Sequence, residues 1–87
     1  MYDILFSLRA KKEFDSLDGT VQKHIIGVLE RIRVRPERFV KKLVGHPGYR
    51  LHAGDYRIIL DIEKERLLIL VLKVGHRKNI YKLYGQD

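Results

Sequence analysis

The chain has 87 residues, and 18 lysines and arginines against 11 aspartates and glutamates give it a formal net charge of +7. A chain of this length has room for one hydrophobic core, so we expect a single domain over residues 1–87. The apolar fraction of 45% argues against disorder, and no apolar run approaches the roughly 18 residues of a membrane-spanning helix. The absence of cysteine excludes disulfides and thiolate metal sites and fits a cytoplasmic location.

The positive charge is concentrated in two blocks of the sequence. Residues 1–30 are close to neutral, whereas residues 31–54 and residues 66–86 together hold most of the lysines and arginines. Such clustering favours a surface that faces nucleic acid. On charge alone, a basic chain that is simply soluble, or one that binds an acidic protein, remains an alternative.

The first part of the chain predicts a strand followed by a helical hairpin. Tyr2, Ile4 and Phe6 alternate with more polar positions, as in a short strand. Ser7 can cap a helix over residues 9–17, because its hydroxyl can accept a hydrogen bond from a free amide of the first turn. After Asp18-Gly19, a second helix is expected over residues 20–35, where apolar residues recur at helical spacing until Pro36 ends it.

The second part of the chain predicts three strands and a short helix. Residues 36–48 form a basic connector with room for a turn of helix at residues 37–42. Alternating apolar residues then predict strands over residues 49–53, 56–62 and 67–74. A short helix is expected after Gly75. The order βααβββ indicates an α+β domain, with the helical hairpin packed on one face of a small antiparallel sheet.

Polar and cationic side chains converge on the face of this sheet that the hairpin leaves open. Gly54-Asp55 is a two-residue turn signal, and such a turn places His52 directly opposite Arg57 with Arg50 two residues along the same face. Cations opposed across strands repel, so stability alone would not select this arrangement. We interpret the cluster as a functional site, the alternative being a solvated face with scattered charges.

Three motifs resemble the RelE/ParE toxin superfamily of toxin–antitoxin systems: L-x-G-x-x-G-Y-R-L, G-D-Y-R-I and V-G-H-R-K-N-I-Y. The resemblance covers essentially the whole chain and is closest to the RelE branch. It implies a toxin that cuts messenger RNA in the ribosomal A site, with a RelB-like antitoxin as its partner. Operator DNA would be contacted only through the antitoxin. The ParE branch, which acts on DNA gyrase without cleaving RNA, and a decayed RNA- or protein-binding module are the alternatives.

The resemblance also implies roles for individual residues. Arg57 matches the family arginine that contacts the scissile phosphate, and Arg77 matches an arginine implicated in phosphate binding and leaving-group protonation. Tyr81 resembles the tyrosine that orients the substrate nucleotide, although it lies closer to Arg77 than in the best-known member. Arg50 and His52 stand where that member has two lysines. Arginine holds phosphate but is a poor proton acceptor, whereas histidine exchanges protons near neutral pH.

These residues suggest cleavage without a metal or other cofactor. His52 is the candidate general base toward the 2′-hydroxyl, and Arg57 and Arg50 are candidates for stabilising the charge of the phosphorane. For the acid that protonates the leaving 5′-oxygen, chemistry favours His76 and the family resemblance favours Arg77; sequence does not choose between them. Further cations are expected to attract the RNA backbone: Arg33, Arg35, Arg38, Lys41, Lys42 and Lys78.

Overall fold

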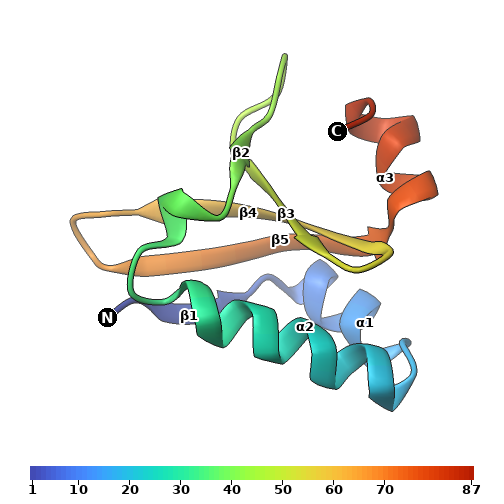
Figure 1. The fold of residues 1–87 in the computed structure, drawn as a ribbon, viewed down its shortest axis with the longest axis horizontal. Coiled ribbons are helices and arrows are strands. Elements are labelled where there is room, and N and C mark those ends of the chain that lie inside the picture. The colour runs from blue at the N-terminus through green and yellow to red at the C-terminus, as the bar shows by residue number, and fades with distance from the viewer.

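The protein is built around a five-stranded sheet with helices on both faces (Figure 1), as described by a computed structural model of residues 1–87. The strands lie side by side in the order β1-β5-β4-β3-β2. The elements in chain order are β1 (Asp3–Phe6), α1 (Leu8–Asp15), α2 (Gly19–Ile32), the 3-10 helix η1 (Pro36–Arg38), β2 (Lys41–Lys42), β3 (Tyr49–Ala53), β4 (Tyr56–Glu63), β5 (Leu68–His76) and α3 (Arg77–Tyr84). This α+β fold was predicted from the sequence.

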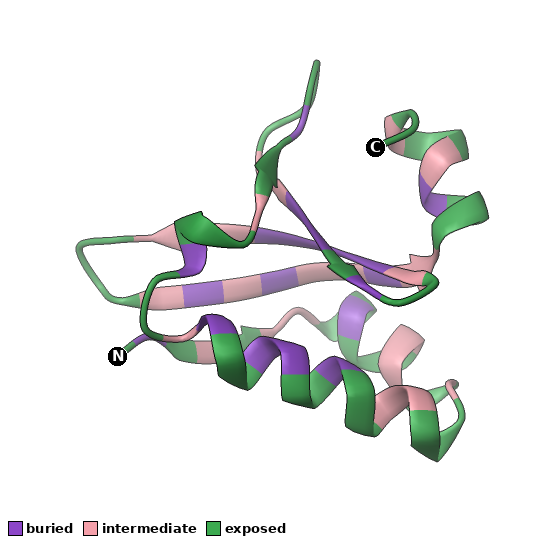
Figure 2. Ribbon diagram, in the orientation of Figure 1, coloured by how far each residue is buried: buried purple, intermediate pink, exposed green.

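The helical hairpin α1–α2 covers one face of the sheet and builds the main core. Ser7 caps α1 as predicted, because its hydroxyl accepts a hydrogen bond from the Ala10 amide at 3.1 Å. The side of α2 that faces the sheet is buried and the other side is exposed (Figure 2). The core consists of Tyr2, Ala10, Ile25, Val28, Leu29, Ile32, Leu51, Ala53, Ile58, Leu60, Ile69, Val71 and Val74.

The sheet differs from the prediction at both edges. β1 pairs with β5 in parallel, so the sheet is mixed rather than antiparallel. Alternation of apolar residues predicts the faces of a strand but not its neighbour, which explains the error. At the other edge, β2 replaces the helical turn expected at residues 37–42, and only η1 is helical there. A strand of two residues is too short to show a pattern.

The β3–β4 hairpin has the predicted register. Ala53 faces Tyr56 and His52 faces Arg57 across the turn, and Gly54 adopts a positive φ of 62°. Between β4 and β5, the register shifts after Ile59, which leaves Leu72 as an extra residue on β5. This bulge keeps both Val71 and Val74 in the core beneath the hairpin.

On the opposite face, α3 packs on the end of the sheet through a second, smaller cluster. Ile80 is fully buried and lies with Ile59 and Leu43. Gly75 makes room for this contact, since a Cβ at that position would lie 3.4 Å from the Ile80 side chain. The β2–β3 loop and α3 therefore rise from the same face of the sheet (Figure 1). None of the helices has the length and apolar character needed to cross a lipid bilayer.

Candidate active site

Two buried arginines lie next to each other on the face of the sheet that carries α3. Arg50 on β3 and Arg57 on β4 are each only 5% exposed. The Nη1 atom of Arg57 donates to the carbonyl oxygens of Gly54 and Tyr56, at 2.7 and 2.9 Å, so the hairpin turn fixes its guanidinium. The Nε and Nη2 edge remains available as a fork for an anion. Two buried positive charges this close require an anion between them.

The side chain of Asp87 supplies that anion. Its Oδ2 accepts hydrogen bonds from Arg57 Nη2 at 2.8 Å, Arg57 Nε at 3.0 Å and the Tyr81 hydroxyl at 2.8 Å. Its Oδ1 accepts from Arg50 Nη1 at 2.7 Å and lies 3.1 Å from His52 Nε2. Each carboxylate oxygen is thus surrounded by donors, as a phosphate oxygen would be. The arrangement is a preformed site for an oxyanion.

The electrostatics of the cluster are those of a strong ion pair. Partial burial disfavours the charged form of Asp87, but the hydrogen bonds from Arg57, Arg50 and Tyr81 outweigh it and hold the pKa of the carboxyl far below its ordinary value. Burial likewise disfavours the guanidinium of Arg57, yet the bonds with Asp87 and Tyr81 raise its pKa. Both groups are therefore charged at neutral pH.

Helix α3 completes the site from above the sheet. The ring of Tyr81 lies 5.9 Å from the Arg57 guanidinium carbon and 6.0 Å from that of Arg50, so it makes cation–π contacts with both. The carbonyl of Tyr84, at the end of α3, accepts from Arg50 Nη2 at 3.1 Å. The packing of Ile80 on the sheet holds this helix in place.

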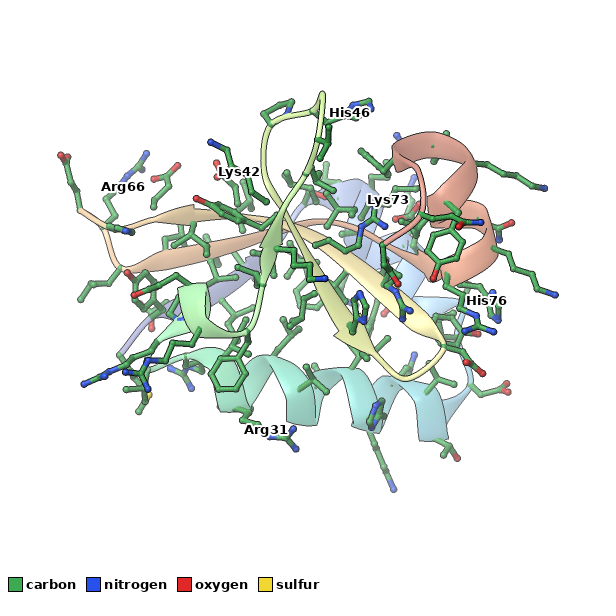
Figure 3. All side chains as sticks on the ribbon, turned by 45° about the horizontal axis from the view of Figure 1, so that its top comes forward. Arg31, Lys42, His46, Arg66, Lys73 and His76 are labelled. Carbon is green, nitrogen blue, oxygen red and sulfur yellow. The ribbon has the colours of Figure 1, made fainter.

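A cavity of about 160 Å³ opens beside the anion site, between β2, the β2–β3 loop and α3. Lys41 lies opposite Arg50 in the sheet register and on the same face. His46 of the loop makes an edge-to-face contact with Tyr84, with ring centroids 4.9 Å apart. In Figure 3, Lys42 and His46 mark the loop that borders the cavity. Its lining consists of Lys41, Lys42, Leu43, Val44, Arg50, Tyr84, Gln86 and Asp87.

The structure brings four of the predicted site residues together: Arg50, His52, Arg57 and Tyr81. His76 is placed differently. It caps α3 by accepting from the Lys78 amide at 3.2 Å through Nδ1, and its ring contacts Tyr56 at a centroid distance of 5.5 Å. The register puts Tyr56 on the face opposite Arg57, so His76 is turned away from the anion.

Arg77 and Lys78 occupy the exposed first turn of α3. The backbone amide of Arg77 donates to the carbonyl of Asp55 at 2.8 Å, which ties α3 to the hairpin turn. Its side chain forms no hydrogen bond or ion pair within the chain. Arg77 is therefore free to meet a ligand, but it is not part of the buried cluster.

Three of the predicted RNA-binding cations lie at the end of the molecule away from α3. Arg33 ends α2, donates from Nε to the Tyr2 carbonyl at 2.7 Å and pairs with Glu30 at 2.9 Å. These contacts give Arg33 a structural role, as a clamp between β1 and α2. Arg35 directly precedes η1, and Arg38 is its last residue. Figure 3 labels Arg66 at this end of the sheet and His76, beside α3, at the opposite end of the view.

Sequence reasoning missed two carboxylates that matter to the site. Asp87 gave no signal beyond being the first acidic residue after the basic block at residues 66–86. Glu13 of α1 accepts from Lys73 Nζ at 2.6 Å and from the Val74 amide at 3.0 Å, and so holds the end of β5 from which α3 starts. Val74 lies beyond Val71, the last residue of β5 that pairs with β1, and nothing in the spacing of Glu13 predicts its contact with the Val74 amide.

Comparison with known proteins shows which family and which proteins this chain is similar to. Residues 4–81 match the family model of the ParE toxin of type II toxin–antitoxin systems. The chain is 29% identical over 80 residues to the mRNA interferase toxin RelE of Escherichia coli, covering 88% of this chain and 84% of that protein. A chain of the intact E. coli RelBE toxin–antitoxin complex superposes with a TM-score of 0.74 at 30% identity, over 87% of this chain and 96% of that one. The RelBE2 complex of Mycobacterium tuberculosis shares the fold, with a TM-score of 0.80 at 23% identity over 87% and 98% of the two chains.

Proposed function

The chain belongs to the ParE toxin family of type II toxin–antitoxin systems and is a homologue of RelE, and from this premise we propose that it is a ribosome-dependent endoribonuclease that cleaves messenger RNA in the ribosomal A site. One observation carries the proposal. The Asp87 carboxylate is bound by Arg50, Arg57 and Tyr81 beside His52, and its oxygens stand in for those of a scissile phosphate.

The proposed reaction begins with the 2′-hydroxyl of the RNA. His52 lies 3.1 Å from one oxygen of the bound anion and takes the proton of this hydroxyl as general base. The 2′-oxygen then attacks the phosphorus, and the 5′-oxygen of the next nucleotide leaves, which gives a 2′,3′-cyclic phosphate. A positioned base of this kind contributes about 10²–10⁴-fold to the rate.

Arg57 and Arg50 stabilise the extra negative charge of the phosphorane in this mechanism. Their guanidinium groups are buried and fixed by backbone carbonyls, so they need no reorganisation when charge develops. Removing one such donor from a preorganised site costs about 10²–10³-fold in rate. Tyr81 adds a hydrogen bond to the same oxygen as Arg57 and presents its ring to the substrate.

The leaving 5′-oxygen needs a proton from the other side of the phosphate. Of the two candidates, Arg77 has the side chain that is exposed and without a partner in the chain, at the start of α3. His76 uses Nδ1 to cap this helix and faces Tyr56. We therefore assign His76 a positioning role for α3. Arg77 would hold a solvent water against the leaving 5′-oxygen and polarise it, and this water donates the proton.

A cognate antitoxin and the ribosome are the proposed partners. The solved relatives include RelB–RelE assemblies, and a RelB-like antitoxin that covers the basic face would neutralise this chain. Lys41 and Lys42 border the cavity beside the anion site, where they would follow the RNA backbone.

In vitro translation of a defined messenger tests the function, with cleavage sites mapped by primer extension. We expect cuts at A-site codons that require the ribosome, and a loss of about 10²–10³-fold or more in cleavage for Arg57→Ala and Arg57→Lys. Lysine keeps the charge but lacks the fork. Arg66→Ala, which removes an exposed cation at the β4–β5 turn, is the matched control and should cleave normally.

Full activity of a folded Arg57→Ala protein would overturn the assignment of the site. An uncut messenger with wild-type protein would overturn the nuclease function itself. Inhibition of DNA gyrase supercoiling by that same wild-type protein would then establish the ParE-type alternative.

A further inference from the structure

The residues that follow α3 return to the sheet and occupy the anion site. We propose that the Gly85–Asp87 segment is an autoinhibitory strap, whose Asp87 carboxylate competes with the RNA phosphate for Arg50, Arg57 and Tyr81. This inference rests on the proposed function and adds a form of regulation to it. The free protein is held closed by its own carboxylate, and the site becomes available when RNA displaces the strap.

The contacts of Asp87 are those of a ligand rather than of a surface residue. Its side chain is 19% exposed, and it accepts four hydrogen bonds of 3.0 Å or less from Arg50, Arg57 and Tyr81. These are the same donors that the proposed mechanism gives to the phosphate. One set of donors cannot serve both anions at once, so binding of the strap and binding of RNA exclude each other.

The backbone is shaped to deliver this carboxylate. Gly85 ends α3 with φ 81° and ψ 171°, a conformation open almost only to glycine. Its amide donates to the Tyr81 carbonyl at 2.8 Å, so the turn begins within the helix end. Gln86 and Asp87 then line the cavity beside the site. The strap thus forms one wall of the cavity and also occupies the arginines.

Tethering makes a weak ligand effective. A carboxylate three residues beyond α3 meets the site at an effective concentration on the order of millimolar or higher, because its linker is short. The apparent affinity for RNA is then lowered by the fraction of molecules in which the site is open. A strap closed in about nine molecules of ten weakens RNA binding about tenfold.

A purely structural ion pair would behave differently from a competitor. If Asp87 only balanced the charge of two buried arginines, its loss would disorder the site and weaken RNA binding. If Asp87 competes with RNA, its loss lowers the stability of the free protein and strengthens RNA binding. Opposite changes in stability and affinity are therefore the signature of the strap.

Two variants separate the strap from a general effect of charge. Asp87→Asn removes the carboxylate, and Asp18→Asn makes the same change of charge at an exposed residue on the helical hairpin. Gly85→Ala keeps the charge and meets no neighbouring atom within 4 Å, so it only penalises the turn. Gly27→Ala, also without neighbours within 4 Å but inside α2, is its control.

The experiment measures binding of a short single-stranded RNA carrying 2′-O-methyl groups, which blocks cleavage, by fluorescence anisotropy. We expect the Kd to fall about tenfold for Asp87→Asn and to fall, by a smaller factor, for Gly85→Ala. The melting temperatures of Asp87→Asn and Gly85→Ala without RNA should fall as well. Neither control should lower the Kd by more than about twofold, as expected for a single exposed charge.

The outcomes distinguish the strap from the site it rests on. Equal affinities for Asp87→Asn and Asp18→Asn, with binding still lost in Arg57→Ala, would overturn the strap and leave the phosphate site in place. If adding Arg57→Ala to Asp87→Asn leaves the Kd for RNA unchanged, both the phosphate site and the strap are overturned. Tighter binding by Asp87→Asn that is lost on adding Arg57→Ala establishes both.

Discussion

On β4, Ile58 and Ile59 are neighbours in the chain but lie on opposite faces of the sheet. Ile58 belongs to the main core under α1 and α2, whereas Ile59 lies in the small cluster under α3. Both are almost fully buried. The face under α1 and α2 is a continuous apolar layer. The face under α3 combines three buried apolar residues with two buried arginines. One face therefore supplies stability, and the other gives up part of its packing to hold an anion site.

Truncation of Ile58 or Ile59 to alanine should give the largest change in stability, and it tests whether the two faces of the sheet have separate roles. We expect Ile58→Ala to lower the free energy of unfolding by about 2–5 kcal/mol, because it opens a cavity in the main core. Ile59→Ala should lie at the low end of this range, since only Leu43 and Ile80 surround it as buried partners. Urea denaturation measures both values.

The rate of RNA cleavage per folded molecule should fall more in Ile59→Ala than in Ile58→Ala, the reverse of their order in stability. Loss of Ile59 loosens α3 and displaces Tyr81, and a displacement of about 1 Å near reacting groups can cost on the order of 10²-fold in rate. Ile58→Ala, assayed where it remains folded, should cleave at the wild-type rate. Equal losses of activity in the two variants would mean that the faces are not separate in function.

The division between the faces was largely predictable, and its reason lies in the strand period. Two-residue alternation along β3 and β4, joined by a turn at Gly54, determines that His52 and Arg57 share one face. The helical spacing in α2 determines which side of that helix packs against the sheet. These are local rules that act over a few residues, and they were sufficient to bring Arg50, His52 and Arg57 together.

The errors concern contacts between segments far apart in the sequence. β1 pairs in parallel with β5 because β5 is left with an unpaired edge by the strands β3, β4 and β5. No local sequence pattern predicts which edge strand β1 joins. The extra residue at Leu72 changes the phase of β5 without any marker in composition. Asp87 reaches the site only because α3 ends at a glycine with a positive φ. A single acidic residue beyond a basic block does not predict such a contact.

Glu13 links the two faces of the sheet, because it lies on α1 and binds the end of β5 from which α3 starts. Its carboxylate is partly buried, which disfavours the charge, but the bonds from Lys73 and the Val74 amide prevail and lower its pKa below the ordinary 4.5. Glu13→Gln should lower the free energy of unfolding at neutral pH by about 1.5–3 kcal/mol, the contribution of hydrogen bonds to a charged group.

The pH dependence of this loss has a defined sign. A depressed pKa in the folded state stabilises the protein above the ordinary pKa, and this stabilisation disappears as the pH falls through the folded value. The difference between wild type and Glu13→Gln should therefore be constant near neutral pH and shrink below about pH 4.5. Asp87 titrates in the same direction in both proteins, so its contribution cancels from the difference. A difference that grew with acid would contradict the assignment.

The smallest effect is expected from the edge of the α3 face. Lys41 lies opposite Arg50 and lines the cavity, where it would contact one RNA phosphate. Lys41→Ala should raise the Kd for RNA only modestly at physiological salt. The slope of log K against log salt, however, should fall by about 0.7, the value for one phosphate contact on a single strand. Lys23→Ala, an exposed cation on α2, should leave the slope unchanged.

The slope discriminates between the two faces better than the affinity does. Both variants lower the net charge by one, so any long-range attraction to RNA changes equally in the two. Counterion release, in contrast, requires that the lysine lie against a phosphate in the complex. A reduced slope for Lys41→Ala alone places the RNA on the α3 face beside the anion site. Equal slopes for the two variants would mean that the RNA backbone does not follow β2.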